Sequence, residues 1–519
     1  MTTSSWDLVV VGTGFGGSMV ALAAARAGLR VLLIERGRWV DRDDSAWDPR
    51  SILLDRKYRS ATAFETPRVG FGRTRTFPDE FVGGKSVVYG AASFRLREGD
   101  FQLRERYPGL CPDLVDWPIS YRDLAPFYDQ AEQLLGVAGV AGRDPNEPPR
   151  TGPYPTAPPL YSAPARRVAD AAAALGLHPF PIPLAINFAA TDARRACVQC
   201  LTCDLFPCKI CAKNDLSVTV LPLAIAAGAT VLPNTLAVKL CREGTRISDV
   251  ECVNTVTGER SSISCRVAVV SAGAIPSPAL LLASGLGRVG PSGGWIGRSL
   301  MRHCSGIVIG VFADRTNPER TFHKQVALTD FYFGEEGGSP PGPWGMIQGL
   351  QVAPPEYITA EGGFPVGTLG AKTVDRDIFL MCIGQDLPDP ANRIEIDPGM
   401  IDPFGAPIPR VFHRYTGRDR DARRALYRVS ARILRKAGAL IRVRKPINTF
   451  SHALGSCRFG HDPARAALDP WCRFFGAPNL FVVDASFMPS SGGVNPSLTI
   501  AANALRVGEH LVAEWNQLA

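Results

Sequence analysis

Short apolar runs separated by turn residues characterise the hydrophobic pattern of this chain. Residues 7–37, DLVVVGTGFGGSMVALAAARAGLRVLLIERG, predict a buried strand, a tight glycine turn, an alanine-rich helix and a second buried strand. Two later runs, VAVVSAGA at 267–274 and FVVDA at 481–485, are continuously apolar, as buried parallel strands are. The pattern therefore predicts a β–α–β unit at the N-terminus and further buried strands far along the chain.

A second group of strand-like runs lies in residues 305–353 and 376–415, and includes GIVIGVFAD, GMIQGLQVA and DIFLMCIG. The densest basic stretch, residues 418–446, has Leu426, Val429, Ile433 and Leu440 at roughly helical spacing. It predicts a helix with a solvated basic face, in preference to a surface for nucleic acid or membrane. The proline-rich residues 142–160 predict an extended loop or lid.

Composition narrows the class of protein. A chain of 519 residues is too long for one simple core and predicts two or three domains. Its content of 45% hydrophobic and 20% charged residues is ordinary for a globular protein. The net charge of +8 is spread along the chain, so neither nucleic acid nor membrane is expected as a partner. No apolar run reaches the roughly 20 residues of a membrane span, and no signal peptide is recognised. The 13 cysteines are therefore expected as reduced thiols in the cytoplasm.

The glycine turn has the spacing of a dinucleotide site. Gly12, Gly14 and Gly17 form G-x-G-x-x-G directly after a strand, and Glu35 ends the next strand. Glycines let the backbone approach a pyrophosphate, the helix N-terminus faces its charge, and the carboxylate accepts hydrogen bonds from ribose hydroxyls. The motif by itself does not separate NAD from FAD.

Four further segments separate the two cofactors. They are FVGGKSVVYGAASFRLREGDF (81–101), GAIPSPALLLASGLG (273–287), DLPDPANRIEIDPGMIDPFGAPIPRVFHRY (386–415) and the C-terminal pair SHALGSCRFGHDP (451–463) and LFVVDASFMPSSGGVNPSLTIAANAL (480–505). Together they resemble the glucose–methanol–choline (GMC) oxidoreductases, FAD enzymes that oxidise alcohols. The VGGKSVVYGA segment is similar to the version in pyranose oxidases and their bacterial relatives. Val88 stands near the place where some of those enzymes link flavin through a histidine, so noncovalent FAD is expected.

The resemblance implies an α/β fold with a Rossmann-like FAD-binding domain and a substrate domain built on an antiparallel sheet backed by helices. The FAD domain would gather residues 1–110, 195–300 and 446–519. The substrate domain would comprise residues 111–194 and 301–445, including the proline-rich loop. The resemblance also implies a set of cofactor-binding positions: Gly12, Gly14, Phe15, Gly16, Gly17, Glu35, Arg36, Gly83, Gly84, Ser86, Val88, Tyr89, Gly90, Val238, Ala272, Gly273, Asp484, Ala485, Asn495, Pro496 and Ser497.

His452 and Asn495 match the family's catalytic positions. His452 would take the hydroxyl proton while flavin N5 takes the hydride, and the rate should rise with pH through a pKa of about 6 to 8. Asn495 precedes Pro496, so its side chain is expected to cap a helix, to donate a hydrogen bond to the substrate oxygen, or both. The remaining histidines lack a motif and are expected to be structural: His178, His303, His323, His413, His461 and His510.

Five cysteines fall within residues 197–211: Cys197, Cys200, Cys203, Cys208 and Cys211. Their C-x2-C-x2-C-x4-C spacing is similar to a ferredoxin ligand run without matching it, and short thiolate spacings also suit zinc. An iron–sulfur cluster, a zinc site and a loop of reduced or locally disulfide-linked thiols all remain open at this level.

The leading hypothesis is FAD-dependent oxidation of a hydroxyl group of a sugar, glycoside or sugar-like natural product to a carbonyl. A steroid or other bulky alcohol is the alternative substrate. An FAD-binding lyase without redox turnover, or a non-catalytic flavin-binding scaffold, is an alternative of another class. The expected partners are a small-molecule alcohol and an electron acceptor, either O2 or an unidentified one.

Overall fold

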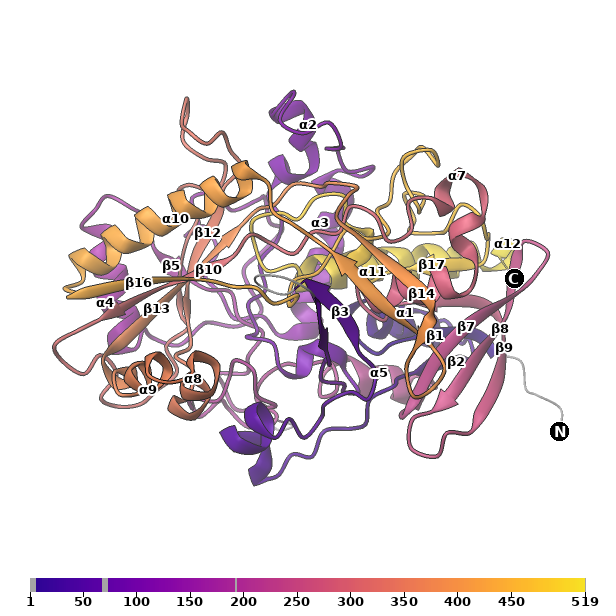
Figure 1. Ribbon diagram of the computed structural model, residues 1–519, viewed down its shortest axis with the longest axis horizontal. Helices are drawn as coiled ribbons and strands as arrows, with labels where there is room; N and C mark the ends of the chain where they lie inside the picture. Colours follow the sequence, from indigo (N-terminus) through magenta and orange to yellow (C-terminus); the bar gives the residue numbers. More distant parts are fainter. Residues whose placement is uncertain (1–5, 68–72, 192–193, 519) are drawn as a thin grey trace.

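The computed structural model describes residues 6–67, 73–191 and 194–518, whose strands form three sheets (Figure 1). A seven-stranded sheet has the order β6-β2-β1-β9-β8-β7, with β17 also paired to β9. Its members are β1 (Trp6–Val11), β2 (Val31–Ile34), β6 (Thr230–Leu232), β7 (Thr235–Glu243), β8 (Arg246–Asn254), β9 (Arg260–Val270) and β17 (Leu480–Val482). The predicted buried strands at both ends and in the middle of the chain are confirmed.

Strand β9 explains how this sheet is assembled. Its second half pairs in parallel with β1 and with β17, and its first half pairs antiparallel with β8. The apolar residues of β1 and β2 are buried on both faces, as a parallel sheet covered by helices requires. Helix α1 (Phe15–Arg26) follows β1, and α11 (Ser497–Ala513) crosses it so closely that a Cβ on Gly508 would lie 2.9 Å from the Cβ of Ala23.

A six-stranded antiparallel sheet lies at the other end of the molecule, in the order β16-β10-β13-β12-β11-β5 (Figure 1). Its members are β5 (Phe180–Pro181), β10 (Gly306–Val311), β11 (Val326–Leu328), β12 (Gly345–Leu350), β13 (Asp377–Gly384) and β16 (Ile441–Pro446). Alternate side chains of these strands point to opposite faces of the sheet and belong to two different cores. On one face, Val308, Ile347 and Leu380 pack with helices α4 (Ala163–Ala173) and α10 (Gly417–Lys436). On the other face, Met346 and Met381 belong to the core shared with the parallel sheet.

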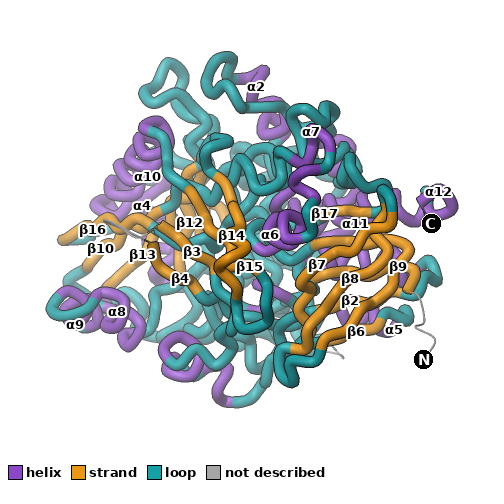
Figure 2. The backbone as a smooth tube through the Cα atoms, turned by 45° about the vertical axis from the view of Figure 1, so that its right-hand side comes forward, coloured by secondary structure: helices purple, strands orange, loops and turns teal. Residues whose placement is uncertain are grey.

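A four-stranded sheet lies between the other two, in the order β14-β15-β3-β4 (Figure 2). It consists of β3 (Phe64–Pro67), β4 (Arg73–Thr76), β14 (Arg393–Ile401) and β15 (Pro407–Phe412). Strand β3 comes from the segment assigned to the FAD domain and β15 from the segment assigned to the substrate domain, and the two pair at Glu65 and Arg410. The exact domain division stays a prediction.

The remaining helices are short, apart from α3. They are α2 (Leu103–Arg106), α3 (Tyr121–Leu135), α5 (Val220–Ala226), α6 (Pro276–Ala283), α7 (Gly290–Gly293), α8 (Pro355–Gly362), α9 (Val366–Ala371) and α12 (Trp515–Leu518). Among the helices that the structure describes, none has both the length and the apolarity needed to cross a bilayer. All 13 cysteines lie in described residues and are free thiols.

Two expectations about loops and helices need comment. The helix predicted in the basic stretch ends at Lys436, so Leu440 is not on its apolar face and is exposed before β16. The proline-rich segment is an extended loop, as predicted, and buried ion pairs join it to the body of the protein. Asp144 pairs with Arg97, and Arg150 pairs with Glu132.

Candidate active site

The glycine turn after β1 is shaped by close backbone approaches. Gly12 has a φ of +99°, and a Cβ on it would lie 2.4 Å from the carbonyl oxygen of Ser271 at the end of β9. A Cβ on Gly17 would lie 2.0 Å from the oxygen of Gly12, and a Cβ on Gly16 would lie 2.3 Å from the oxygen of Val483. Only glycine fits at these positions, because each contact is with backbone that cannot move aside.

Gly14 differs from Gly12, Gly16 and Gly17, because a Cβ added to Gly14 would meet no atom within 4 Å. It caps helix α1, which begins at Phe15, so the first backbone N–H groups of the helix start at this turn. The Cα of Gly14 would in turn lie 2.9 Å from a Cβ on Gly84 of the VGGKSVVYG segment. The structure thus brings the two glycine motifs together around the N-terminus of one helix, which suits a pyrophosphate.

Thr13 connects these motifs, although the sequence analysis did not select it. Its hydroxyl donates to Oε2 of Glu35 over 2.7 Å and accepts from the backbone N–H of Gly83 over 2.8 Å. The other oxygen of Glu35 accepts from the N–H of Gly37 over 3.0 Å. The glycine turn itself therefore orients the carboxylate of Glu35 at the end of β2. Glu35 is 8% exposed. The signal in the sequence that could have identified Thr13 is its polar side chain between the two glycines Gly12 and Gly14.

Asp484 occupies the corresponding place after β17. Its Oδ2 accepts hydrogen bonds from the N–H of Gly273 over 2.9 Å and from the hydroxyl of Ser277, and its Oδ1 accepts from the N–H of Ser486 over 2.9 Å. Asp484 therefore ties Ala485 and the end of β17 to the loop after β9 that carries Ala272 and Gly273. Direct contact of Asp484 with a cofactor stays a prediction.

The other expected cofactor residues are placed as follows. Val238 has no Cα partner in the β7–β8 register, which shifts between Ala237 and Lys239 at a bulge. Ser86 donates to the oxygen of Gly83 over 2.6 Å. Two side chains are engaged with protein groups: Arg36 pairs with Glu80 at 2.8 Å, and the Tyr89 hydroxyl donates to the oxygen of Asn214 over 2.9 Å. Val88 is partly exposed, and Gly90 packs against the Asp204–Lys324 ion pair.

His452 lies in the loop after β16, where the chain is held by a short bridge. Two residues later, Leu454 exchanges two backbone hydrogen bonds of 2.9 Å with Met301. This pairing sets the His452 loop beside the segment that carries His303, and the Nδ1 atoms of His452 and His303 lie 3.0 Å apart. The Nε2 atom of His452 has no hydrogen-bond partner among the described residues, and the side chain is only half-buried. Nε2 is therefore free to take a proton.

Burial, the neighbouring His303 and the cation of Lys324 lower the pKa of His452 to about 3. Lys324 is itself buried and pairs with Asp204 at 2.9 Å. The expected pKa of 6 to 8 is therefore wrong for this site, because the histidine type suggests that value while the apolar and cationic surroundings disfavour the imidazolium. These surroundings favour the neutral imidazole at neutral pH, and the role of His452 as the base stays a prediction.

A pH profile checks this. The rate of flavin reduction by substrate should be level from about pH 5 to pH 9 and should fall only in more acidic solution, because protonation of His452 begins far below neutrality. The measurement is anaerobic stopped-flow absorbance with saturating substrate. An inflection near pH 6.5 that disappears in His452→Gln would show that the imidazole titrates at its ordinary value.

Asn495 is not a helix cap. Helix α11 begins at Ser497, its N-cap is Pro496, and no side chain accepts a capping hydrogen bond there. Asn495 is 8% exposed, and its Oδ1 is buried without a partner among the described residues. An unpaired buried amide oxygen is costly, so a polar group from outside the chain is needed to satisfy it. The capping role is thus excluded, and contact of the amide with a bound molecule stays a prediction.

Replacing Asn495 tests this reading. Asn495→Ala and Asn495→Ser should leave the free energy of unfolding of the apoprotein within about 0.5 kcal/mol of wild type, because no cap is lost. Both should slow flavin reduction by about tenfold or more, the scale of one hydrogen bond to a polar or charged group. Chemical denaturation and stopped-flow reduction measure the two quantities. A destabilised Asn495→Ala that is rescued by serine at full rate would restore the capping role.

The five clustered cysteines do not surround a common ion. Within the described ranges, no three side chains of His, Cys, Asp or Glu are arranged to hold a metal. Burial raises the pKa of Cys197 to about 11 and also raises that of Cys203, which favours the protonated thiol at both positions. The folded cysteines therefore do not fit an iron–sulfur cluster or zinc, and no step of the chemistry is assigned to either.

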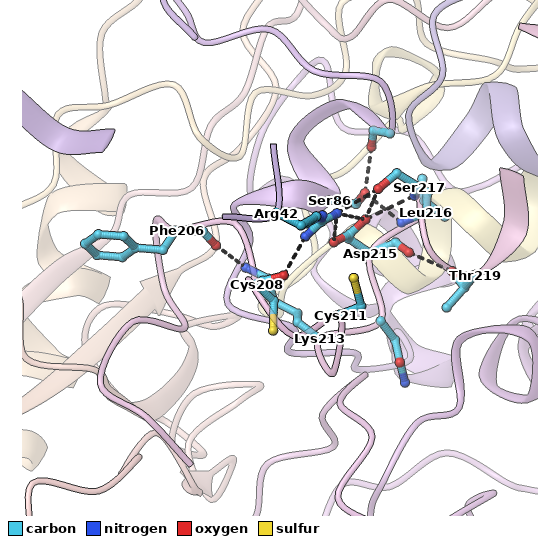
Figure 3. Close-up of polar contacts among 12 residues, drawn as sticks. Arg42, Ser86, Phe206, Cys208, Cys211, Lys213, Asp215, Leu216, Ser217 and Thr219 are labelled. Carbon is cyan, nitrogen blue, oxygen red and sulfur yellow. Dashed lines mark hydrogen bonds and ion pairs between the residues drawn. The ribbon is translucent and has the colours of Figure 1, made fainter. Parts of the chain in front are cut away.

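Polar contacts to the backbone order the cysteine loop instead (Figure 3). The buried Nζ of Lys213 donates to the carbonyl oxygens of Tyr89, Cys203 and Phe206 over 2.6 to 3.1 Å. Arg42 donates to the oxygen of Cys208 and pairs with the fully buried Asp215 at 2.9 Å. These contacts join the loop to the VGGKSVVYG segment, which explains a compact loop without any sulfur bond.

The site as a whole fits FAD. Close approaches at the turn leave room only for glycine, a Cβ on Gly14 would meet open space, Val238 lies at a bulge of β7, and Oδ1 of Asn495 has no partner among the described residues. Two family models match the chain, one for the N-terminal part of GMC oxidoreductases over residues 9–305 and one for the C-terminal part over residues 388–504. The chain belongs to the GMC oxidoreductase family. It is an FAD-dependent oxidoreductase acting on CH–OH groups, with a small-molecule alcohol as substrate and an electron acceptor.

Two curated relatives and one solved structure describe its place in the family. Paromamine 6'-oxidase of Streptomyces fradiae is 34% identical, covering 96% of this chain and 90% of that protein. The 6'''-hydroxyparomomycin C oxidase of Streptomyces lividus is 33% identical, and the match covers 98% of this chain and 92% of that protein. The crystal structure of pyridoxine 4-oxidase from Mesorbium loti superimposes with a TM-score of 0.70 at 21% identity, covering 98% and 99%, and supports the GMC fold.

The mode of FAD attachment is testable. The VGGKSVVYG segment has no histidine, and Val88 cannot form a bond to flavin. Acid or heat denaturation of the purified yellow protein should therefore release all of the FAD into the supernatant. Flavin absorbance that stays with the precipitated polypeptide would contradict noncovalent binding.

Proposed function

We propose that this enzyme oxidises a hydroxyl group of a sugar or glycoside to a carbonyl, with an aminosugar-containing glycoside as the first substrate to test. The observation that carries the proposal is the His452 imidazole, whose Nδ1 lies 3.0 Å from His303, a ring that also contacts the carbonyl oxygens of Ser491 and Gly492 ahead of Asn495. The two relatives named for oxidation of paromamine and 6'''-hydroxyparomomycin C each cover more than nine-tenths of this chain and direct the choice of substrate.

The chemistry divides between the residues as follows. Bound FAD supplies the hydride acceptor. The Asn495 amide orients the substrate oxygen by donating a hydrogen bond, while Nε2 of His452 accepts the hydroxyl proton. One O–H and one C–H bond are broken, an N–H bond forms at Nε2, and the carbon becomes a carbonyl. The low pKa of His452 favours return of that proton to solvent or to the reduced electron acceptor afterwards.

An anaerobic screen tests the proposal. Paromamine should bleach the flavin absorbance, whereas its analogue with an amine in place of the 6'-hydroxyl should not, because the pair differs only at the reacting group. Bleaching by cholesterol and not by glycosides would move the assignment to a steroid alcohol. Cleavage of a cyanohydrin without any bleaching would identify a lyase. Oxygen consumption, compared with reduction of an artificial dye, then distinguishes O2 from another electron acceptor.

A further inference from the structure

His303 contacts both His452 and the loop that leads to Asn495. Its ring is 1% exposed. On one side its Nδ1 is 3.0 Å from Nδ1 of His452, which is 149 residues away in sequence. On the other side its Nε2 is 3.0 Å from the carbonyl oxygens of both Ser491 and Gly492, just ahead of Asn495. A single imidazole therefore contacts the His452 loop and the Asn495 loop together.

These contacts determine where the ring protons lie. Carbonyl oxygens only accept hydrogen bonds, so Nε2 of His303 carries a proton and donates it. Burial lowers the pKa of His303, so the ring is neutral and its Nδ1 is a bare acceptor. Nδ1 of His452 must then be the donor across the 3.0 Å contact. A neutral His452 with its proton on Nδ1 has its lone pair on Nε2, the atom left free on the open side.

The backbone of His303 is held in an unusual conformation that serves this placement. Its φ is +57°, a left-handed value that non-glycine residues rarely adopt. The carboxylate of Asp386 accepts from its N–H over 3.0 Å, and the hydroxyl of Tyr415 donates to its carbonyl oxygen over 2.7 Å. Backbone strain that is held by surrounding contacts is typical of functional positions.

We infer that His303 is a positioning residue that locks His452 in the tautomer with a free Nε2. The inference deepens the proposed function and rests on His452 being the base there. When Nε2 takes the substrate proton, Nδ1–H continues to donate to the neutral His303. The carbonyl oxygens beyond His303 cannot take up a proton, so the proton does not pass on through this ring. It leaves His452 only from the Nε2 side, where the substrate was bound.

The tautomer can be read directly by NMR. The probe is the holoenzyme with selectively 15N-labelled histidine, observed by long-range 1H–15N correlation at neutral pH, with His452→Gln used to assign the signal. His452 should carry its proton on Nδ1, and His303 should carry its proton on Nε2. Finding the His452 proton on Nε2, or His303 doubly protonated, would overturn the inference whatever the activity of the enzyme.

Two isosteric replacements of His303 separate acceptor from donor. In His303→Asn, the amide oxygen stands near the Nδ1 position and can still accept from His452. In His303→Gln, the amide nitrogen reaches the carbonyls and the acceptor for His452 is lost. His303→Gln should show a mixture of His452 tautomers and reduce flavin about tenfold or more slowly, with little change in substrate Kd. His303→Asn should keep a single tautomer and recover most of the rate.

His510→Asn is the matched control, because it removes another partly buried imidazole, one that stacks on Trp471 and not on His303 or His452. It should leave the His452 tautomer and the reduction rate unchanged. Equal effects of all three variants, in step with lost FAD or stability, would make His303 a merely structural residue. If the tautomers are as inferred but His452→Gln reduces flavin at the wild-type rate, the proposed function fails while the lock itself stands.

Discussion

Replacing His452 with alanine should lower the rate of flavin reduction by substrate about 100-fold or more, the usual scale for losing a positioned base. The structure gives the reason: Nε2 of His452 has no hydrogen-bond partner among the described residues, and its pKa of about 3 keeps the imidazole unprotonated. FAD content should stay at wild-type level, since His452 makes no contact with the glycine turns. Anaerobic stopped-flow absorbance and the flavin-to-protein ratio measure the two effects.

His461→Ala is the control for this substitution, because His461 is exposed and lies outside the site. It should reduce flavin at the wild-type rate. A His452→Ala enzyme that retains its FAD and reduces it within a factor of about three of wild type would remove His452 from the chemistry.

Gly16→Ala should yield a protein that is purified with little bound FAD. A Cβ at Gly16 would lie 2.3 Å from the carbonyl oxygen of Val483 and 2.6 Å from the hydroxyl of Ser271. Relief requires β17 and the turn after β1 to separate, and overpacking of this kind costs about 1–3 kcal/mol. The turn, the helix N-terminus and the Asp484 loop would then no longer be aligned for one cofactor. Flavin absorbance and chemical denaturation of the apoprotein measure the losses.

Two alanine variants sharpen this prediction. Gly14 has nothing within 4 Å of an added Cβ, so Gly14→Ala should fold with wild-type apoprotein stability yet bind FAD more weakly. Gly152, in the proline-rich loop, also has open space and should tolerate alanine in both respects. A Gly16→Ala protein with full FAD content and unchanged stability would show that the close approach to Val483 is not a real constraint.

The fold class and the cofactor could be recognised from the sequence because their signals are local. The glycines of G-x-G-x-x-G and apolar runs such as DLVVV reflect the steric requirements of the neighbouring backbone. They can therefore be recognised without knowing which distant segments they contact. The buried strands, the antiparallel second sheet and FAD as cofactor are accordingly confirmed. His452 and Asn495 could be named by resemblance alone, and their roles stay predictions.

Other features of the site depend on contacts between segments that are distant in the sequence, so only the tertiary structure decided them. The sequence allowed Asn495 to cap a helix, to face the substrate, or both, yet the helix starts at Ser497 and no side chain caps it. It suggested metal ligands in the cysteine run, yet Lys213 and Arg42 order that loop. It set the pKa of His452 by residue type, and it placed His303 among the structural histidines. Tautomer and pKa depend on desolvation and on neighbours brought from 149 residues away, and no local pattern encodes them.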